Sequence, residues 1–311
     1  MLNIINKRYY FFALSFLLIL PGLIIISMNG VPLSIDFEGG SLIELEIPLK
    51  YQPSRSDFEE IYSNYSISDF QYQTSKNESN YIVIIKSTTL AQDQYSDLIS
   101  EIRTFYGPDL VERRFNTVGP TISQSVTQRA LLAIAIASIA VVLYITFAFR
   151  GISHAFRYGI CAIIAMFHDI LIVISISAIG SKLFGWEMDS LFLTALLTVI
   201  GFSTQDKIVV FDRIRENAPV LRKISFEKLV NHSIIQSLQR SINTQLMTVE
   251  FLLLSLALFG GDTIQQMSII LLVGLLSGTY SSIFIAAPLL VVWENRDWKR
   301  WFKGPSKSQV T

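Results

Sequence analysis

Long apolar runs and one polar segment alternate along the chain. Apolar runs of about 20 residues cover 9–28, 130–149, 158–179, 190–211, 242–259 and 264–293. A run of that length crosses a bilayer as a helix. The first run exceeds the apolar core of a signal peptide, about 7–15 residues, and no small-x-small cleavage site follows it, so we expect it to remain as a helix. The pattern predicts a polytopic α-helical membrane protein with six transmembrane helices.

The polar segment 29–126, between the first two helices, has its own periodicity. Alternating positions predict strands, and helical spacing predicts two helices, one capped by Ser54 or Ser56. The strands fall at 41–47, 67–73, 81–86 and 110–118, the helices at 54–65 and 90–106, and the second helix buries Tyr95, Leu98, Ile99, Ile102 and Phe105. The order β-α-β-β-α-β predicts an α+β ferredoxin-like domain.

Basic residues predict the topology. Lys7-Arg8 precede the first helix, and further Lys and Arg residues follow the second and fourth helices and the last one. Cytoplasmic loops carry an excess of such residues. We therefore expect both termini in the cytoplasm and the acidic segment 29–126 outside. The predicted organisation is a cytoplasmic N-terminus with helix 1 (1–28), the extracytoplasmic domain (29–126), helices 2–6 (127–293) and a basic tail (294–311).

Composition narrows the function classes. Of the 311 residues, 51% are hydrophobic and only 16% are charged, against about 25% charged in a soluble domain. The net charge is zero, and nothing in it points to nucleic acid. The one cysteine, Cys161, offers neither a disulfide nor a metal cluster, and no GxxxxGK[ST] loop for a nucleotide occurs. We expect no cofactor, no bound metal and no enzymatic site.

The candidate chemistry lies in the fourth helix, where Asp206 and Lys207 interrupt an apolar run. A charge in lipid costs a few kcal/mol unless it faces a partner or water, so such a site is functional by default. A carboxyl group there can take up and release a proton as its surroundings change. Arg240, at the cytoplasmic end of the next helix, is the candidate cation. The alternatives are a static ion pair for Asp206, and for Arg240 a side chain that reaches to the lipid head groups.

Two further features belong to the helices. His168 and Asp169 could extend a proton relay, since histidine changes charge near neutral pH; an interhelical hydrogen bond that fixes packing is the favoured reading. Gly274 and Gly278 form a GxxxG spacing that lets two helices approach closely.

Several segments together resemble the SecF family, the six-helix subunits of bacterial protein export. They are Asp36-Phe37-Glu38-Gly39-Gly40, Phe167-His168-Asp169, Gly201 to Asp206, Val209 to Asn217 with Asp212, Arg213 and Arg215, Gln239 to Thr244, Phe259-Gly260-Gly261, and Gly278 to Ile283. The simplest role of the Gly39-Gly40 and Gly260-Gly261 pairs is in turns, with backbone angles closed to other residues.

The resemblance implies half of a resistance-nodulation-division transporter in the inner membrane. With a SecD-like subunit it would form a twelve-helix unit that uses the proton gradient to help unfolded preproteins through the SecYEG channel and its accessory membrane subunits. It ties the positions of Asp206 and Arg240 to proton conduction. Lys207 and Glu250 depart from the family pattern with opposite charges, and we expect them to pair across the fourth and fifth helices. Glu250 as an additional proton carrier is the alternative.

Other function classes fit less well. An intramembrane aspartyl protease needs two facing carboxylates, and Asp262 is predicted at the outer turn, far from Asp206. Another alternative is a small-molecule exporter of the same superfamily. Such exporters usually carry two six-helix halves on one chain, whereas this chain has one and would have to self-associate. A scaffolding subunit without ion conduction stays open, as does the choice between H⁺ and Na⁺.

Overall fold

The computed structural model describes residues 3–65, 67, 69–77, 79–150, 155–245 and 251–297. The chain divides into two compact units. A helical unit contains residues 1–32, 133–186 and 191–311, and an α+β unit contains residues 33–132 with 187–190.

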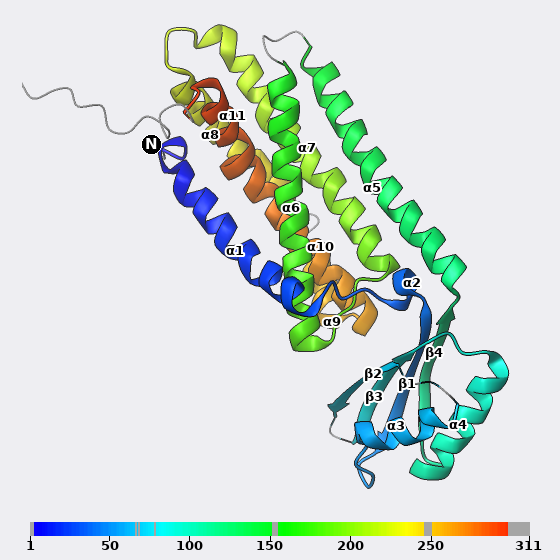
Figure 1. Cartoon of the computed structure of the whole chain (residues 1–311). Coiled ribbons are helices and arrows are strands. Elements are labelled where there is room, and N and C mark those ends of the chain that lie inside the picture. Colours follow the sequence, from blue (N-terminus) through cyan, green and yellow to red (C-terminus); the bar gives the residue numbers. More distant parts are fainter. Residues whose placement is uncertain are drawn as a thin grey trace, which may run out of the picture. The chain divides into compact units, whose positions relative to one another are not determined.

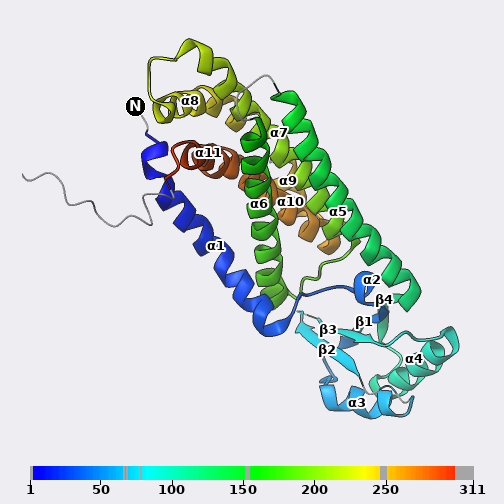
Figure 2. The ribbon, with the colours of Figure 1, turned by 45° about the horizontal axis from the view of Figure 1, so that its top comes forward.

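Long helices form the helical unit (Figure 1). In chain order they are η1 (Ile5–Lys7), α1 (Arg8–Asn29), α5 (Pro120–Ala148), α6 (Ala155–Phe184), α7 (Ser190–Val220), α8 (Phe226–Gln245), α9 (Phe251–Phe259), α10 (Asp262–Ser281), η3 (Ser282–Ala286) and α11 (Ala287–Glu294). Helix α5 up to residue 132 and Ser190, the first residue of α7, belong to the other unit. Helix α6 packs against both α1 and α10, and α1 runs beside α6 in both views (Figures 1 and 2).

Five of the six predicted spans appear as helices long and apolar enough to cross a membrane. They cover Ile5–Asn29, Pro120–Ala148, Phe156–Phe184, Ser190–Val220 and Ile264–Glu294. The remaining predicted span, 242–259, includes residues 246–250, which lie outside the described part of the chain. Two helices do not coincide with the predicted apolar runs. Helix α7 continues to Val220, beyond the run that ends at 211, and α8 continues to Gln245, past residue 242 where the fifth run begins.

The core of the helical unit joins α6, α7, α8 and α11. Phe211 and Ile214 of α7 and Val230 and Ile234 of α8 are fully buried in it. The apolar face of α8 is therefore the one that packs. Large apolar side chains of α1 and α5 remain exposed, among them Phe16, Leu17, Leu131 and Leu143, as expected of helices that face lipid.

Helix α1 contains a proline, whose missing N–H interrupts the backbone ladder. Ser175 of α6 compensates at the next residue. The Gly22 N–H donates to Ser175 Oγ at 3.2 Å, and that hydroxyl lies 3.2 Å from the carbonyl oxygens of Leu18 and Ile19. A β carbon on Gly22 would lie 2.3 Å from Ser175 Cα. This close crossing fixes α1 against the helix that carries Asp169.

The α+β unit has the predicted ferredoxin-like order. It consists of α2 (Ile35–Glu38), β1 (Gly40–Pro48), α3 (Arg55–Ser63), β2 (Phe70–Lys76), β3 (Asn80–Ser87), α4 (Gln92–Tyr106) and β4 (Val111–Val118). The strands pair antiparallel in the order β2-β3-β1-β4. Helices α3 and α4 lie on the same face of the sheet (Figure 2), and Ile43, Leu45 and Ile47 of β1 are fully buried beneath them.

Local signals position the two helices of this unit. Ser54 caps α3 in a reciprocal capping box with Asp57, whose carboxylate also accepts a 2.7 Å bond from the Tyr106 hydroxyl. Burial would raise the pKa of Asp57, but the hydrogen bonds from Tyr106 and Ser54 outweigh it and lower that pKa. The predicted burial of Phe105 is wrong. Phe105 is 53% exposed, and Tyr106, one residue on, fills the core at 2%.

Candidate functional site

Two carboxyl groups lie in the interior of the helical unit, Asp169 on α6 and Asp206 on α7. They are 1% and 6% exposed. Helix α7 presents Ser203, Asp206 and Lys207 within about one turn, so its side chains reach neighbours on two sides. Most of the groups that meet these carboxylates are serine hydroxyls from α7, α8, α10 and η3.

Asp169 has a complete set of donors. Its Oδ1 accepts from Ser277 Oγ at 2.7 Å and lies 3.1 Å from His168 Nδ1. Its Oδ2 accepts from Ser203 Oγ at 2.5 Å, Ser281 Oγ at 2.7 Å and Lys207 Nζ at 2.7 Å. A buried carboxylate is stable only when it is paired and hydrogen-bonded, and Asp169 meets both conditions.

Lys207 is fully buried and pairs with Asp169. Its Nζ also donates to the hydroxyl of Ser203 and, at 3.3 Å, to the Ser203 carbonyl. The three donors of the ammonium group thus all meet oxygen atoms. The predicted partner, Glu250, lies outside the described residues. The ion pair that the structure gives Lys207 is with Asp169, for which the sequence interpretation favoured an interhelical hydrogen bond over a relay with His168 and did not consider Lys207.

Asp206 has a different environment, made of two neutral hydroxyls. Its Oδ1 accepts from Ser241 Oγ of α8 at 2.8 Å, and its Oδ2 accepts from Ser282 Oγ of η3 at 2.7 Å. Among the described residues, no Lys, Arg or His nitrogen lies within ion-pair distance of this carboxyl group. Arg240, its predicted cation, is exposed on α8. The structure therefore does not bring Asp206 and Arg240 together, although Ser241 is the next residue along α8.

The junction of α10 and η3 connects the two carboxyl groups. Ser281 donates to Asp169 and Ser282, its neighbour, donates to Asp206. A π-helical segment, Ser282–Ala286, begins at this point. Such segments are rare and occur frequently at functional sites. Serine is common in membrane helices, so the sequence interpretation gave none of the five serines a site role, although all except Ser277 lie in segments that carry the SecF resemblance.

His168 lies at the edge of the site. Its ring stacks on Tyr280, with centroids 6.1 Å apart, and its Nε2 has no hydrogen-bond partner in the described part of the chain. The Tyr280 hydroxyl donates to the Phe11 carbonyl of α1 at 2.9 Å. Within the described residues, no three His, Cys, Asp or Glu side chains form a metal-binding cluster.

Small residues of α10 bring the site together. A β carbon on Gly274 would lie 2.2 Å from Val199 Cγ2 of α7, and one on Gly278 would lie 3.1 Å from Ser203 Cα. The predicted GxxxG contact is therefore a crossing of α10 with α7, at the level of Ser203. The close approach lets Ser277 and Ser281 reach Asp169.

The segment Asp36 to Gly40 belongs to the α+β unit. Asp36 accepts from the backbone N–H and the hydroxyl of Ser190, at 3.0 and 2.7 Å, and so caps the start of α7. The Phe37 carbonyl accepts from the Thr127 hydroxyl at 3.1 Å. Gly39 and Gly40 have φ of +81° and +116°, which confirms that they supply angles open to glycine.

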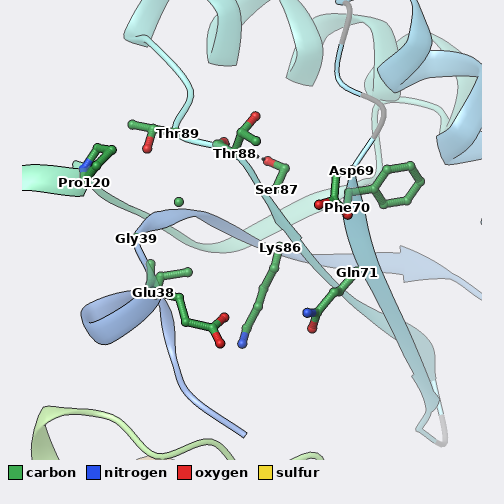
Figure 3. A pocket seen from close by; sticks show the side chains of 12 residues that line it. Glu38, Gly39, Asp69, Phe70, Gln71, Lys86, Ser87, Thr88, Thr89 and Pro120 are labelled. Atoms are coloured by element: carbon green, nitrogen blue, oxygen red, sulfur yellow. Dashed lines mark hydrogen bonds between the residues drawn. The ribbon is translucent and has the colours of Figure 1, made fainter. Parts of the chain in front are cut away.

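A cavity of about 520 Å³ lies beside this segment in the α+β unit. Figure 3 shows Glu38, Gln71 and Lys86 extending to the same side of the strands. Lys86 forms an ion pair of 2.6 Å with Glu187. Burial raises the pKa of Glu187, and the Lys86 ammonium offsets part of that rise.

The remaining predicted residues have structural contacts. At the end of α7, Arg215 pairs with Asp212 at 2.6 Å and Arg213 pairs with Glu216 at 2.8 Å, all of them partly exposed. Gly260 and Gly261 lie in the turn between α9 and α10, as predicted, but the reason given for glycine there is wrong, because neither has positive φ. A β carbon on Gly260 would lie 2.4 Å from the Leu256 carbonyl oxygen, so close packing is what requires glycine there.

Comparison with known proteins assigns the chain to a family. The sequence model of the protein export membrane protein SecD/SecF, C-terminal, matches residues 98–296, and that of the SecD/SecF GG motif matches residues 24–47. The protein translocase subunit SecF of Anaerolinea thermophila is 55% identical over 307 residues, 99% of both chains. The chain belongs to the SecF family. A SecF of Thermobaculum terrenum is 46% identical over 97% of each chain.

A solved structure supports the SecF fold over nearly the whole chain. The crystal structure of SecDF, a translocon-associated membrane protein from Thermus thermophilus, superimposes with a TM-score of 0.78 at 28% identity. The match covers 95% of this chain and 39% of that longer chain. The SecF-family chain is thus a multi-pass membrane protein that carries an antiparallel sheet domain.

Proposed function

We propose that this chain is a SecF-type subunit of a protein translocase and works with a SecD-like subunit. The full-length identity of 55% to a protein translocase subunit SecF carries this proposal. The protein translocase subunit SecDF of Bacillus subtilis supports the pairing. This chain matches only 38% of that single polypeptide, and the unmatched part is long enough to contain a SecD-like half.

In this function Asp206 is the group that takes up and releases the proton. It is buried between α7, α8 and η3, and two neutral hydroxyls hold it. Arg240 and Ser241 are adjacent on α8, and consecutive helical residues point about 100° apart. A rotation of α8 would exchange the Ser241 hydroxyl for the Arg240 guanidinium at the carboxyl group. Such an exchange favours release of the proton, because a nearby cation stabilises the carboxylate.

The proposal includes a location and further partners. The chain lies in the inner membrane with both termini in the cytoplasm, as the basic loops favour, and the α+β unit lies outside. Its proposed partners there are the SecYEG channel, accessory membrane subunits and the translocating unfolded preprotein. The proton-motive force supplies the energy, in place of a nucleotide.

The test is ion flux in proteoliposomes that contain this chain and its SecD-like partner. Asp206→Asn keeps the shape of the side chain and removes its titration, so we expect proton uptake to fall to the level of empty liposomes. Asp97→Asn, on the exposed face of α4, is the matched control and is expected to conduct as the wild type does.

The alternatives give different results in the same assay. Flux that persists in Asp206→Asn would refute the role of Asp206. A complex that forms but conducts in neither protein would make the chain a scaffolding subunit. Flux from this chain without a SecD-like partner would favour a self-associating exporter. Flux that follows a Na⁺ gradient and ignores the pH gradient would identify Na⁺ as the driving ion.

A further inference from the structure

The surroundings of the Lys207 ammonium group are unusual for a lysine in a membrane helix. Lysine side chains near helix ends reach toward the interface, but Lys207 is fully buried in the bundle. Its Nζ lies 2.7 Å from Asp169 Oδ2 and 3.3 Å from the Ser203 carbonyl oxygen, and it also contacts the Ser203 hydroxyl. The group therefore occupies a small space lined by a carboxylate, a carbonyl and a hydroxyl.

The same kinds of oxygen atom bind hard metal cations. Carboxylate and carbonyl oxygens are the ligands that such ions prefer, and transporters hold Na⁺ with backbone carbonyls at the bilayer midplane. An ammonium group and an alkali cation both carry one positive charge and seek oxygen. The Lys207 side chain thus supplies beside Asp169 the positive charge that a bound cation could supply.

Other contacts hold these oxygens in place without the lysine. Ser277 and Ser281 of α10 each donate to Asp169 at 2.7 Å. The Ser203 carbonyl belongs to the backbone of α7, and Gly278 lets α10 approach Ser203 closely. Removal of the lysine side chain would leave a space beside a buried carboxylate that lacks a counter-charge. Such a carboxylate either takes up a proton or attracts a cation.

We propose that Lys207 is the built-in occupant of a monovalent-cation site formed by Asp169 and by the hydroxyl and carbonyl of Ser203. The site is closed to Na⁺ in this chain because the ammonium group fills it, and it becomes a Na⁺ site when the lysine is shortened. The inference deepens the proposed ion-driven function, since it makes Lys207 the residue that excludes Na⁺ from Asp169 and leaves Asp206 as the exchanging group.

The experiment compares thermal unfolding of the purified full-length chain in detergent at pH 8. NaCl replaces choline chloride stepwise at constant ionic strength. Lys207→Ser is expected to unfold at a lower temperature than the wild type in choline. Its midpoint should then rise in a saturable way by about 4 °C, the shift for a ligand at about 100 times its Kd in a chain of this size. The wild-type midpoint should not change.

Three variants complete the design. Lys182→Ser makes the same chemical change at an exposed site near the end of α6 and should show no Na⁺ response. Lys207→Ser combined with Asp169→Ser removes the carboxylate ligand and should abolish the response. Lys207→Asn leaves room for an ion and adds an amide oxygen, so its unfolding midpoint should also rise with Na⁺. If Lys207→Ser does not fold in either salt, Lys207→Asn tests the cation site in its place.

Two results would overturn the proposal. One is a folded Lys207→Ser or Lys207→Asn variant whose midpoint ignores Na⁺ but rises as the pH falls, because the carboxylate then takes a proton instead of a cation. The other is a wild-type chain that Na⁺ stabilises as strongly as it does the variants. The measurement needs neither a partner nor a gradient. A negative result in the unfolding measurement would therefore not contradict the proposed function, and a negative result in the flux assay would not contradict this inference.

Discussion

A methyl group added at Gly274 tests whether α10 and α7 cross as closely as the structure shows. The new β carbon would lie 2.2 Å from Val199 Cγ2, 2.9 Å from its Cγ1 and 3.1 Å from its Cβ. Attractive contact between carbon atoms requires about 3.5–4.0 Å, so both methyl groups of Val199 would have to move. Because Val199 is fully buried, they have no free space to enter.

The cost follows from overpacking. Extra methyl groups in a packed core destabilise by about 1–3 kcal/mol, which corresponds to a fall in the unfolding midpoint of roughly 2–5 °C for a chain of this size. Helix propensity acts in the opposite direction, since alanine is favoured over glycine by about 1 kcal/mol. Gly274→Ala should therefore lower the midpoint despite the gain in propensity, as measured by thermal unfolding in detergent.

A compensating change and a matched control make the test specific. Val199→Ala removes the two methyl carbons, and only the contact at 3.1 Å remains, so the double variant should be more stable than the sum of the single effects by about 1 kcal/mol or more. Gly201→Ala, on α7, places its β carbon in open space and should be neutral or stabilising. Strictly additive effects, or a Gly274→Ala protein as stable as Gly201→Ala, would refute the close crossing.

Two further predictions concern the α+β unit, with hydrogen-exchange mass spectrometry as the readout for both. Asp57→Asn should lower the unfolding free energy of the α+β unit by about 1–2 kcal/mol at pH 7. The pKa of Asp57 is lowered in the folded state, so the ionised carboxylate stabilises the unit at any pH above the unfolded pKa. This contribution should disappear as the pH falls below about 4. An equal loss at pH 7 and pH 3 would contradict this role. Gly40→Ala should cost about 1–3 kcal/mol, because φ is +116° and the β carbon would lie 2.4 Å from the Ser87 carbonyl oxygen. Gly119→Ala meets no atom within 4 Å and is the matched control, so an equal effect of the two variants would exclude the clash.

Much of the fold could be predicted because burial imposes a period on the sequence. Alternation along β1 places Ile43, Leu45 and Ile47 on one buried face, and the capping residue of α3 could be limited to two serines from residue type alone. Positions one residue apart are harder, as Phe105 and Tyr106 show. Both are aromatic and close to the apolar stripe of α4, and the tertiary contacts of Tyr106 with Phe58 and Asp57 are what place it in the core.

The site was predicted in part. Asp206 stands out because a charge in an apolar run needs an explanation, but its partners carry no such signal. The pairing of Lys207 with Glu250 rested on opposite charge, and charge does not say which helices are neighbours. The packing of α6 against α10 decides it, together with the reach of Asp169 to Ser203 and Lys207 of α7. A serine pair four residues apart, Ser277 and Ser281, was an available hint of a polar face on α10.

The ion pair of Lys207 with Asp169 also determines how the membrane voltage acts on this bundle. A potential of 100 mV does work of about 2.3 kcal/mol on each elementary charge that moves across the membrane. Lys207 and Asp169 carry opposite charges whose atoms are 2.7 Å apart, so a movement of the pair transfers almost no net charge. In the proposed cycle the electrical part of the driving force therefore acts through the protonation state of Asp206, and the Lys207–Asp169 pair adds almost no electrical cost when α6 and α7 shift together.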